Sequence, residues 1–350
     1  MDILELDNEQ RKYLVDTQAA YRNYREAEQD KRRLRGSMTW KHVAGHDYLA
    51  RSKQAGRWKS LGPRSLETEK TYEAFYAQKT AANERYRRLR EQIKRRVRYA
   101  KANKINRVPK SAASVLRVFE QNDVPVLVAG TSCLFAYEVM AGVQFDSSLT
   151  ATEDLDLIFH PQRRLRIMCD AKPHTILSLL QRADKSFAKA RHASFRAINK
   201  AGFMVDVITF PLRPLTRNPN LETAPGDLEV VEIEKLDWLA SAPVLEIIAI
   251  AEDGIGVRMR VPHPACFAMH KWLIAQKPDR SPVKKPRDLS QAAAMVRLID
   301  QYLPQYALSE AVLSVFPQTL CNQFATWHQN QNASSQSGTN SNDGSLGPGL

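Results

Sequence analysis

Three aspartates lie on two short apolar segments, a placement that suits metal chemistry. Asp154 and Asp156 flank Leu155 at the start of an apolar run that continues to Phe159. Residues two apart in a β-strand project from the same face, so both carboxylates are expected to converge on one point. Asp206 interrupts a second apolar run, 203–208, where a lone charge is costly. Adjacent carboxylates repel unless a cation binds between them, so the three aspartates predict a site for two Mg²⁺ ions.

A turn of small residues precedes the aspartates. The segment 126–135 has the pattern of a strand, a turn at Gly130, Thr131 and Ser132, and the start of a helix. Backbone N–H groups at a helix N-terminus bind anions, and a glycine lets a phosphate approach closely. The segment therefore predicts a phosphate-binding turn.

Each of these two motifs also has a simpler explanation. Asp-x-Asp triplets are common, and two aspartates at an exposed strand end would account for Asp154 and Asp156. A glycine turn in which Thr131 or Ser132 only caps a helix would account for the other motif. The two motifs therefore indicate a nucleotide site mainly in combination.

Alternating strands and helices are expected to position these residues. Helical patterns follow Gly130 and cover about 175–190, and residues 199–202 resemble a hairpin turn, so the sheet is expected to be mixed. Strand patterns cover 124–128, 155–159, 194–198, 203–210, 229–233, 244–251 and 257–261. We expect a catalytic domain over 109–262, a C-terminal helical region over 263–328, and a disordered tail over 329–350, which is rich in Ser, Gly and Asn.

The first hundred residues have a different pattern. Apolar residues recur at helical spacing over 9–35 and again from a cap at Ser65 to the residues before Pro109. Between these segments, 38–62 reads as a small hairpin or meander. The segment 1–108 is therefore expected to form an antiparallel helical arm with a small β cap.

The order of these motifs resembles the nucleotidyltransferase superfamily related to DNA polymerase β. In that superfamily a strand ending in small residues and a helix precede an Asp-x-Asp strand and a later carboxylate. The sequence is most similar to bacterial nucleotidyltransferase-like proteins and to abortive-infection toxin nucleotidyltransferases. It departs from the pattern at Ala129, where a first glycine is usual, and in the 23 residues between Gly130 and Asp154, a longer separation than is usual.

The resemblance implies a fold, a reaction and roles for particular residues. The fold would be α+β, with a polymerase β-like mixed sheet, an N-terminal helical arm and a C-terminal helical region. The reaction would transfer NMP from an NTP such as ATP to a hydroxyl and release pyrophosphate. Asp154 and Asp156 would hold two Mg²⁺ ions, and Asp206 would complete the catalytic metal site and help to deprotonate the acceptor. Gly130, Thr131, Ser132, Lys271 and Arg287 would bind the nucleotide.

Positive charge is concentrated in one segment. The net charge is +13, and residues 85–110 contain twelve Lys or Arg and one acid, Glu91. We expect this segment to bind a structured RNA, plausibly tRNA, at the catalytic cleft through Arg95, Arg96, Arg98 and Lys101, with Tyr99 or Tyr86 stacking on bases. A solvated helix face and an acidic lipid surface remain the alternatives.

Composition and the N-terminus bear on location and class. The longest nearly apolar run, 239–251, has 13 residues, short of the roughly 20 that cross a membrane, and the first residues are acidic rather than basic. We therefore expect a cytoplasmic, Mg²⁺-dependent enzyme with no membrane partner. A catalytically silent nucleic-acid-binding or regulatory protein of the same fold is the alternative, and Ala129 is its best support.

Overall fold

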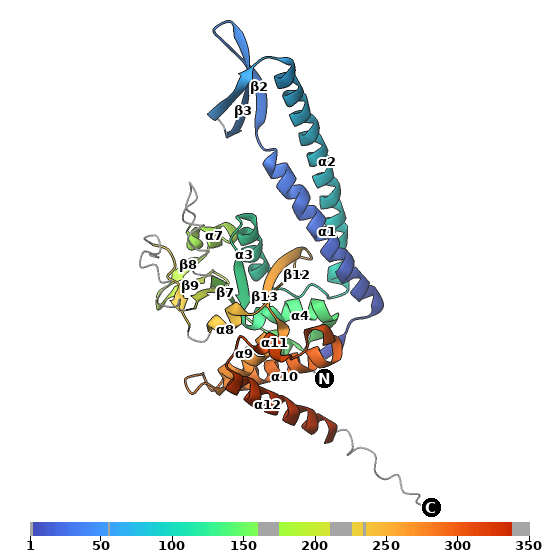
Figure 1. Cartoon of the computed structure of the whole chain (residues 1–350), viewed down its shortest axis with the longest axis vertical. Helices are drawn as coiled ribbons and strands as arrows, with labels where there is room; N and C mark the ends of the chain where they lie inside the picture. Colours follow the sequence, from blue (N-terminus) through green and yellow to red (C-terminus); the bar gives the residue numbers. More distant parts are fainter. Residues whose placement is uncertain (1–2, 55–56, 160–174, 211–225, 234–235, 338–350) are drawn as a thin grey trace, which may run out of the picture. The chain divides into compact units, whose positions relative to one another are not determined.

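The structure is a computed structural model that describes residues 3–54, 57–159, 175–210, 226–233 and 236–337. Its chain divides into two compact units (Figure 1). One unit contains residues 12–106 and 253–256, and the other contains the rest of the described chain.

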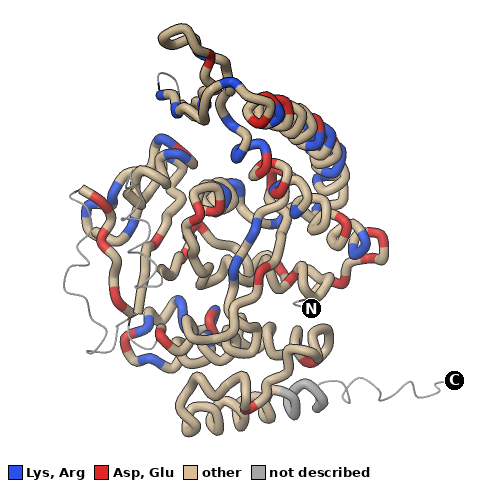
Figure 2. The backbone as a smooth tube through the Cα atoms, turned by 45° about the horizontal axis from the view of Figure 1, so that its top comes forward, with Lys and Arg blue, Asp and Glu red and all other residues tan. Residues whose placement is uncertain are grey.

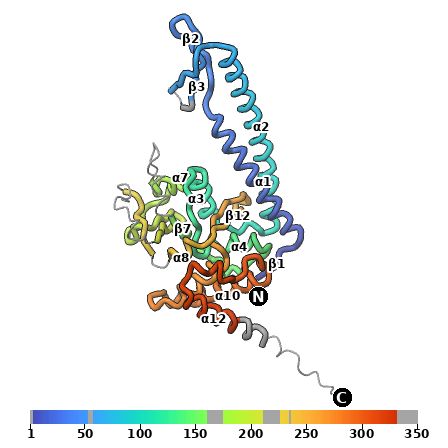
Figure 3. Tube along the Cα trace, viewed as in Figure 1, coloured from blue at the N-terminus to red at the C-terminus, as the bar shows by residue number. Residues whose placement is uncertain are grey.

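The first unit is a helical hairpin whose two helices are connected, at one end, by a small sheet (Figure 3). The helices α1 (Asn8–Arg33) and α2 (Leu66–Ala102) run antiparallel, since Tyr13 stacks on Tyr99 with ring centroids 4.3 Å apart while Tyr24 packs on Tyr86. The three-stranded antiparallel meander consists of β2 (Ser37–Val43), β3 (His46–Gln54) and β4 (Arg57–Pro63). The predicted arm with its meander is present.

Local signals at the helix ends explain where this hairpin begins and ends. Gly36 has φ +92°, a conformation that most residues avoid, and it follows α1. Ser65 caps α2 as predicted, because its side chain accepts from the Thr68 backbone N–H while the Thr68 hydroxyl accepts from the Ser65 N–H.

The second unit is built on a mixed six-stranded sheet. Its main path runs β5–β7–β10–β9–β8, and β11 also pairs with β10. Pairing is antiparallel for β5–β7 and β9–β10 and parallel for β7–β10, so the predicted mixed sheet is confirmed. The strands are β5 (Val126–Ala129), β7 (Asp154–Phe159), β8 (Ala188–Ala190), β9 (Ala193–Ile198), β10 (Met204–Thr209) and β11 (Val231–Glu232).

Helices and two further strand pairs complete this unit. The strand pairs are β1 (Ile3–Glu5) with β6 (Val143–Phe145) and β12 (Val244–Ile250) with β13 (Gly256–Pro262). The helices are α3 (Lys110–Gln121), α4 (Leu134–Ala141), α5 (Ser147–Thr150), α7 (Ile176–Ala183), α8 (Leu236–Ser241), α9 (Pro264–Gln276), α10 (Lys284–Tyr302), α11 (Glu310–Leu313) and α12 (Gln318–Ser337), with 3₁₀ turns η1 (Gly130–Cys133) and η3 (Pro304–Tyr306).

The core of this unit joins the expected catalytic domain to the C-terminal helices. Phe119 of α3 packs edge-on against Phe159 of β7, and Tyr137 of α4 packs against Phe267 of α9. All four side chains belong to one continuous buried cluster. The catalytic and C-terminal segments therefore share one unit.

Three local features differ from the sequence prediction. The helix expected over 175–190 ends at Ala183, and 188–190 instead form β8, which hydrogen-bonds to β9. The pairing of β1 with β6 had no sequence signal. Helix α12 extends to Ser337, into the segment expected to be disordered, and its Phe324 and Trp327 pack against Trp272 of α9; the rest of that segment, 338–350, lies outside the described residues.

Within the described ranges, every helix is too short or too polar to span a bilayer.

Candidate active site

Strand pairing gathers the three predicted aspartates on one face of the sheet. On β7, Asp156 lies opposite Asp206 of the parallel strand β10 and opposite Ala129 of β5. Asp154 precedes Asp156 by two residues, so its side chain projects from the same face. Asp206 is only 7% exposed, while Asp154 and Asp156 are half-buried. The structure therefore brings the three carboxylates together on one face of the sheet, over the neighbouring strands β7 and β10.

Negative charge is incompletely compensated at Asp156. Burial, followed by the charges of Asp154 and Asp206, raises the pKa of Asp156 from 3.8 to about 6, against an opposing effect of Lys271 and Lys284. The carboxyl group therefore holds a proton more readily than an ordinary aspartate. A bound cation would favour its ionised form.

Asp206 is already neutralised by an arginine. Arg196, opposite Asp206 on β9, donates from Nε and Nη2 to the two carboxylate oxygens, each at 2.6 Å. This forked hydrogen bond is the main cause of the raised pKa of Arg196. Both oxygens of Asp206 are thus engaged by the guanidinium.

The side chains fit a metal in part. The two carboxylates on β7 are oxygen ligands of the kind that Mg²⁺ prefers, and the negative charges of Asp154 and Asp206 contribute, after burial, to the raised pKa of Asp156. Among the described residues, however, no three His, Cys, Asp or Glu side chains are arranged to hold one ion. Both oxygens of Asp206 already accept hydrogen bonds from Arg196, so this arginine competes with a metal ion for that carboxylate.

The glycine turn is fitted to Asp156. Gly130 has φ +63°, and a Cβ atom added to it would lie 2.1 Å from Oδ2 of Asp156. Only glycine therefore allows this turn and this carboxylate to coexist. Ala129, by contrast, has extended backbone with φ −124°, so its conformation does not require the glycine that the resemblance led us to expect.

The two hydroxyl residues of the turn have partners within the protein. Ser132 is 1% exposed, and its Oγ donates to the backbone carbonyl of Asp154 at 3.5 Å. Thr131 is half-buried, and its Oγ1 accepts from Nε2 of Gln291 at 3.2 Å. These contacts hold the turn against β7 and α10, and phosphate binding by Thr131 and Ser132 stays a prediction.

Lys271 of α9 lies in a buried ion-pair cluster. The side chain of Lys271 is about 5% exposed, and its Nζ contacts Oδ1 of Asp288 at 3.0 Å. Arg280 contacts the other oxygen of Asp288 at 2.6 Å. The charge of Lys271 still lowers the pKa of Asp156, so this predicted residue acts on the site electrostatically while its ammonium is bound to Asp288.

Arg287 and Gln291 attach α10 to the segment that leads into β7. Arg287 donates to the backbone carbonyl of Ala151, and Nε2 of Gln291 donates to that of Leu149 at 2.7 Å. Gln291 was not predicted and is fully buried. In this structure Arg287 therefore supports the approach to the aspartates, and nucleotide binding by it stays a prediction.

A family model described as "Nucleotidyltransferase" matches residues 110–317 of this sequence. This range contains β5, the glycine turn, the three aspartates and helices α9 and α10. The chain belongs to the nucleotidyltransferase family.

Comparisons with individual proteins add one solved structure. The chain is similar to an antigenic nucleotidyltransferase-like protein from Paracoccidioides brasiliensis, with 15% sequence identity and a TM-score of 0.31. The match covers 65% of this chain and 90% of that one. The search of curated proteins found no significant match.

The basic arm of this nucleotidyltransferase precedes the matched residues. Among its predicted RNA contacts, Arg95, Arg98 and Lys101 are exposed on α2, and Figure 2 shows the basic positions along this helix. Arg96 differs, because it is half-buried and its guanidinium lies 5.6 Å from the ring centroid of Tyr13.

The predicted stacking residues of the arm are already paired. Tyr99 stacks on Tyr13, and the hydroxyl groups of Tyr86 and Tyr24 are 3.3 Å apart. Both rings contact the facing helix, and stacking of either ring on an RNA base stays a prediction.

Two residues of the nucleotidyltransferase site were missed in the sequence. Arg196 could have been found from the hairpin turn 199–202, because the turn sets the register that places Arg196 opposite Asp206. Lys284 is exposed and lowers the pKa of Asp156, but its nearness depends on how α10 packs, for which the sequence holds no signal.

Proposed function

We propose that this nucleotidyltransferase transfers NMP from an NTP to a hydroxyl group of an acceptor, with RNA favoured as the acceptor. The observation that carries the proposal is the placement of Asp154, Asp156 and Asp206 on adjacent strands, with the pKa of Asp156 raised by burial and then by its neighbours. A site that concentrates buried negative charge suits a reaction in which cations bind triphosphate.

Asp154 and Asp156 would hold Mg²⁺, with Asp206 as a third ligand. Two Mg²⁺ ions bound there would neutralise the phosphates and the leaving pyrophosphate. The acceptor oxygen forms a bond to the α-phosphorus as the bond to the bridging oxygen of pyrophosphate breaks. Once Arg196 has released the carboxylate of Asp206, that carboxylate accepts the proton of the acceptor hydroxyl.

Cations near the aspartates would position the triphosphate. Lys284 is exposed and acts on Asp156, so it is suited to contact a phosphate oxygen directly. Released from Asp206, Arg196 would offer its forked donors to the same anion. Lys271 would contribute long-range positive charge from its buried pair with Asp288.

The test is Mg²⁺-dependent labelling of an acceptor. Wild type, Asp154→Asn and Asp156→Asn are incubated with each α-³²P-labelled NTP, Mg²⁺ and total cellular RNA, with protein and small-molecule fractions in parallel. Wild type is expected to label the RNA fraction and release pyrophosphate, and both variants are expected to lose at least 100-fold in rate. The control Asp279→Asn removes an exposed carboxylate and should keep full activity.

The assay also has clear opposing results. If labelling persists in both variants, these aspartates are not the catalytic residues. Transfer to the protein or small-molecule fraction instead of RNA would refute the acceptor.

A catalytically silent nucleotidyltransferase-fold protein is the second candidate. The ion pair between Arg196 and Asp206 favours it, because this pair supplies without metal the charge compensation that catalysis would take from a cation. Isothermal titration with NTP and Mg²⁺ separates the two candidates. A silent protein should show no metal-dependent triphosphate affinity and no pyrophosphate release.

A further inference from the structure

The sheet at the end of the arm has one packed face and one outer face. Met38 and Leu49 of the packed face form a small core with Phe75 of α2, and Oη of Tyr76 donates to the Met38 carbonyl at 2.8 Å. Side chains alternate along a strand, so Lys41 and Tyr48, which pair with each other, project from the opposite face. Trp58 joins this outer face through its pairing with Ser52.

An exposed tryptophan lies beside a lysine on this outer face. Trp58 is 40% exposed, although large aromatic side chains are usually covered. Nζ of Lys41 lies 4.6 Å from the centroid of the Trp58 ring. An aromatic surface and a cation are therefore available at one point.

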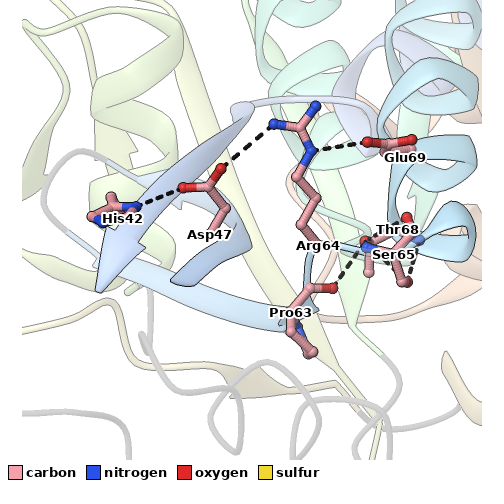
Figure 4. A network of polar contacts seen from close by, with 7 residues as sticks. All are labelled: His42, Asp47, Pro63, Arg64, Ser65, Thr68 and Glu69. Atoms are coloured by element: carbon pink, nitrogen blue, oxygen red, sulfur yellow. Dashed lines mark hydrogen bonds and ion pairs between the residues drawn. The ribbon is translucent and has the colours of Figure 1, made fainter. Parts of the chain in front are cut away.

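The charge of the sheet segment is strongly one-sided. Residues 37–64 contain six Lys or Arg and a single acid, Asp47. Asp47 pairs with His42 on the packed face, where its carboxylate contacts Nδ1 of His42 at 2.9 Å and Nη1 of Arg64 at 3.5 Å (Figure 4). In the described part of the three strands, the outer face thus has no acidic side chain.

The sheet is fixed to the start of α2, so its outer face is preformed. Arg64 contacts Oε1 of Glu69 at 2.8 Å as well as Asp47 (Figure 4). Its guanidinium lies 5.0 Å from the centroid of the Trp40 ring. Arg64 therefore links the sheet to the first turn of α2. A preformed surface loses little conformational entropy on binding.

We propose that the outer face of the sheet β2–β3–β4 binds single-stranded RNA, with Trp58 stacking on an unpaired base and Lys41 contacting a phosphate. An aromatic ring among cations, without acids, matches a ligand that is both a polyanion and a source of exposed rings. A paired duplex presents phosphates but keeps its bases stacked, so it would use the cations alone. The choice of RNA rests on the proposed acceptor.

The exposed cations near the end of α2 would offer a second contact for the same RNA. Arg95, Arg98 and Lys101 lie in the last two turns or so of a 37-residue helix that spans about 55 Å, and the sheet is attached at its other end. These cations would contact the backbone without regard to sequence, while Trp58 would detect unpaired bases. The two parts of the arm therefore predict different effects on RNA binding.

Fluorescence anisotropy with a fluorescein-labelled 20-nucleotide single-stranded RNA tests the proposal. The full chain is used without NTP or Mg²⁺, at several salt concentrations. The same RNA annealed to its complement serves as a duplex probe. Trp58→Ala should weaken single-strand binding roughly 5- to 100-fold with an unchanged salt dependence, while Trp58→Phe should retain most of the affinity. Lys41→Ser should lower the slope of log K against log salt by about 0.7.

Three comparisons make the outcome specific. Leu61→Ala, an equally exposed apolar change on β4, should leave RNA affinity unchanged. The triple variant Arg95→Ser, Arg98→Ser and Lys101→Ser should lower the salt slope by about 2 for the single strand and also weaken the duplex. Circular dichroism checks that each variant is folded.

Two results would overturn the proposal. The first is that folded Trp58→Ala binds RNA as tightly as wild type, which would indicate that this face binds a protein and not RNA. The other is an equal loss for single strand and duplex. Failure of the proposed function is separable, because Asp154→Asn and Asp156→Asn should bind this RNA normally even if they, or the wild type, transfer no nucleotide.

Discussion

Replacement of Asp156 by asparagine should stabilise this protein in the absence of metal. Burial and the charges of Asp154 and Asp206 place the pKa of Asp156 at about 6 in the folded protein, against 3.8 for an ordinary aspartate. Above pH 6 the folded state must therefore hold a charge that the unfolded state holds at less cost. Asparagine keeps the shape of the side chain and removes that charge.

The magnitude follows from the two pKa values. Their difference, at 1.36 kcal/mol for each pH unit, gives about 3 kcal/mol of instability at pH 7.5. Because the folded-state pKa is the higher one, this instability is absent below about pH 4, grows as pH rises from about 4 to 6, and is constant above that. In a unit of this size, 3 kcal/mol corresponds to a rise in Tm of roughly 6–12 °C.

Thermal unfolding from pH 4 to pH 8.5 measures the effect. The Tm of Asp156→Asn should exceed that of wild type at pH 7.5, and the difference should shrink to nothing near pH 4. Mg²⁺ at ten times its Kd should stabilise wild type by about 1.4 kcal/mol and leave the variant unchanged. The exposed change Asp279→Asn should match wild type throughout.

The reasoning fails if Asp156→Asn is less stable than wild type at pH 7.5, or if its Tm advantage does not depend on pH. Either result would show that the carboxylate is compensated within the protein and does not attract a cation.

Two further substitutions test the surroundings of Asp156. Arg196→Met should free Asp206, so we expect tighter Mg²⁺ binding by calorimetry and lower stability without metal. Arg196→Lys keeps the charge and should change the Mg²⁺ affinity and the stability less. Unchanged Mg²⁺ affinity in Arg196→Met would show that the arginine does not compete with metal. Gly130→Ala should lower the unfolding free energy by roughly 2–4 kcal/mol, because alanine is strained in this left-handed conformation and its Cβ clashes with Asp156. Adding Asp156→Ala should remove the clash and regain that part of the stability, but not the part lost to the backbone. Strictly additive losses in denaturant unfolding would contradict this contact.

Much of the fold could be predicted because its signals are local. The apolar spacing in α1 and α2, the cap at Ser65 and the hairpin turn at 199–202 each act within a few residues. The prediction extended the short helix α7 too far, because residues 188–190 have no strong preference for helix or strand and form a strand by pairing with β9. Likewise, Phe324 and Trp327 anchor α12 on α9, and the helix continues from them to Ser337 through residues whose polar composition gives no such signal.

The candidate site shows the same division between local and distant information. Alternation along a strand was enough to place Asp154 beside Asp156, and an acid in an apolar strand was enough to single out Asp206. The partners of the basic residues were not predictable in this way. The sequence shows that Lys271 and Arg287 are cations, but only the packing of α9, α10 and the segment before β7 gives them Asp288 and Ala151 as partners.

The site compensates the charges of Asp206 and Asp156 in different ways, and the difference links metal binding to protons. Asp206 has a permanent cation, Arg196, whose charge does not change in the physiological pH range. Among the described residues Asp156 makes no such ion pair, and a proton compensates its charge when pH falls towards 6. A divalent cation that binds Asp154 and Asp156 therefore competes with a proton. Metal binding by Asp206 as a further ligand competes with an arginine. Binding to the first pair of carboxylates should weaken as pH falls through 6, while recruitment of Asp206 depends on an anion, such as triphosphate, that gives Arg196 another partner.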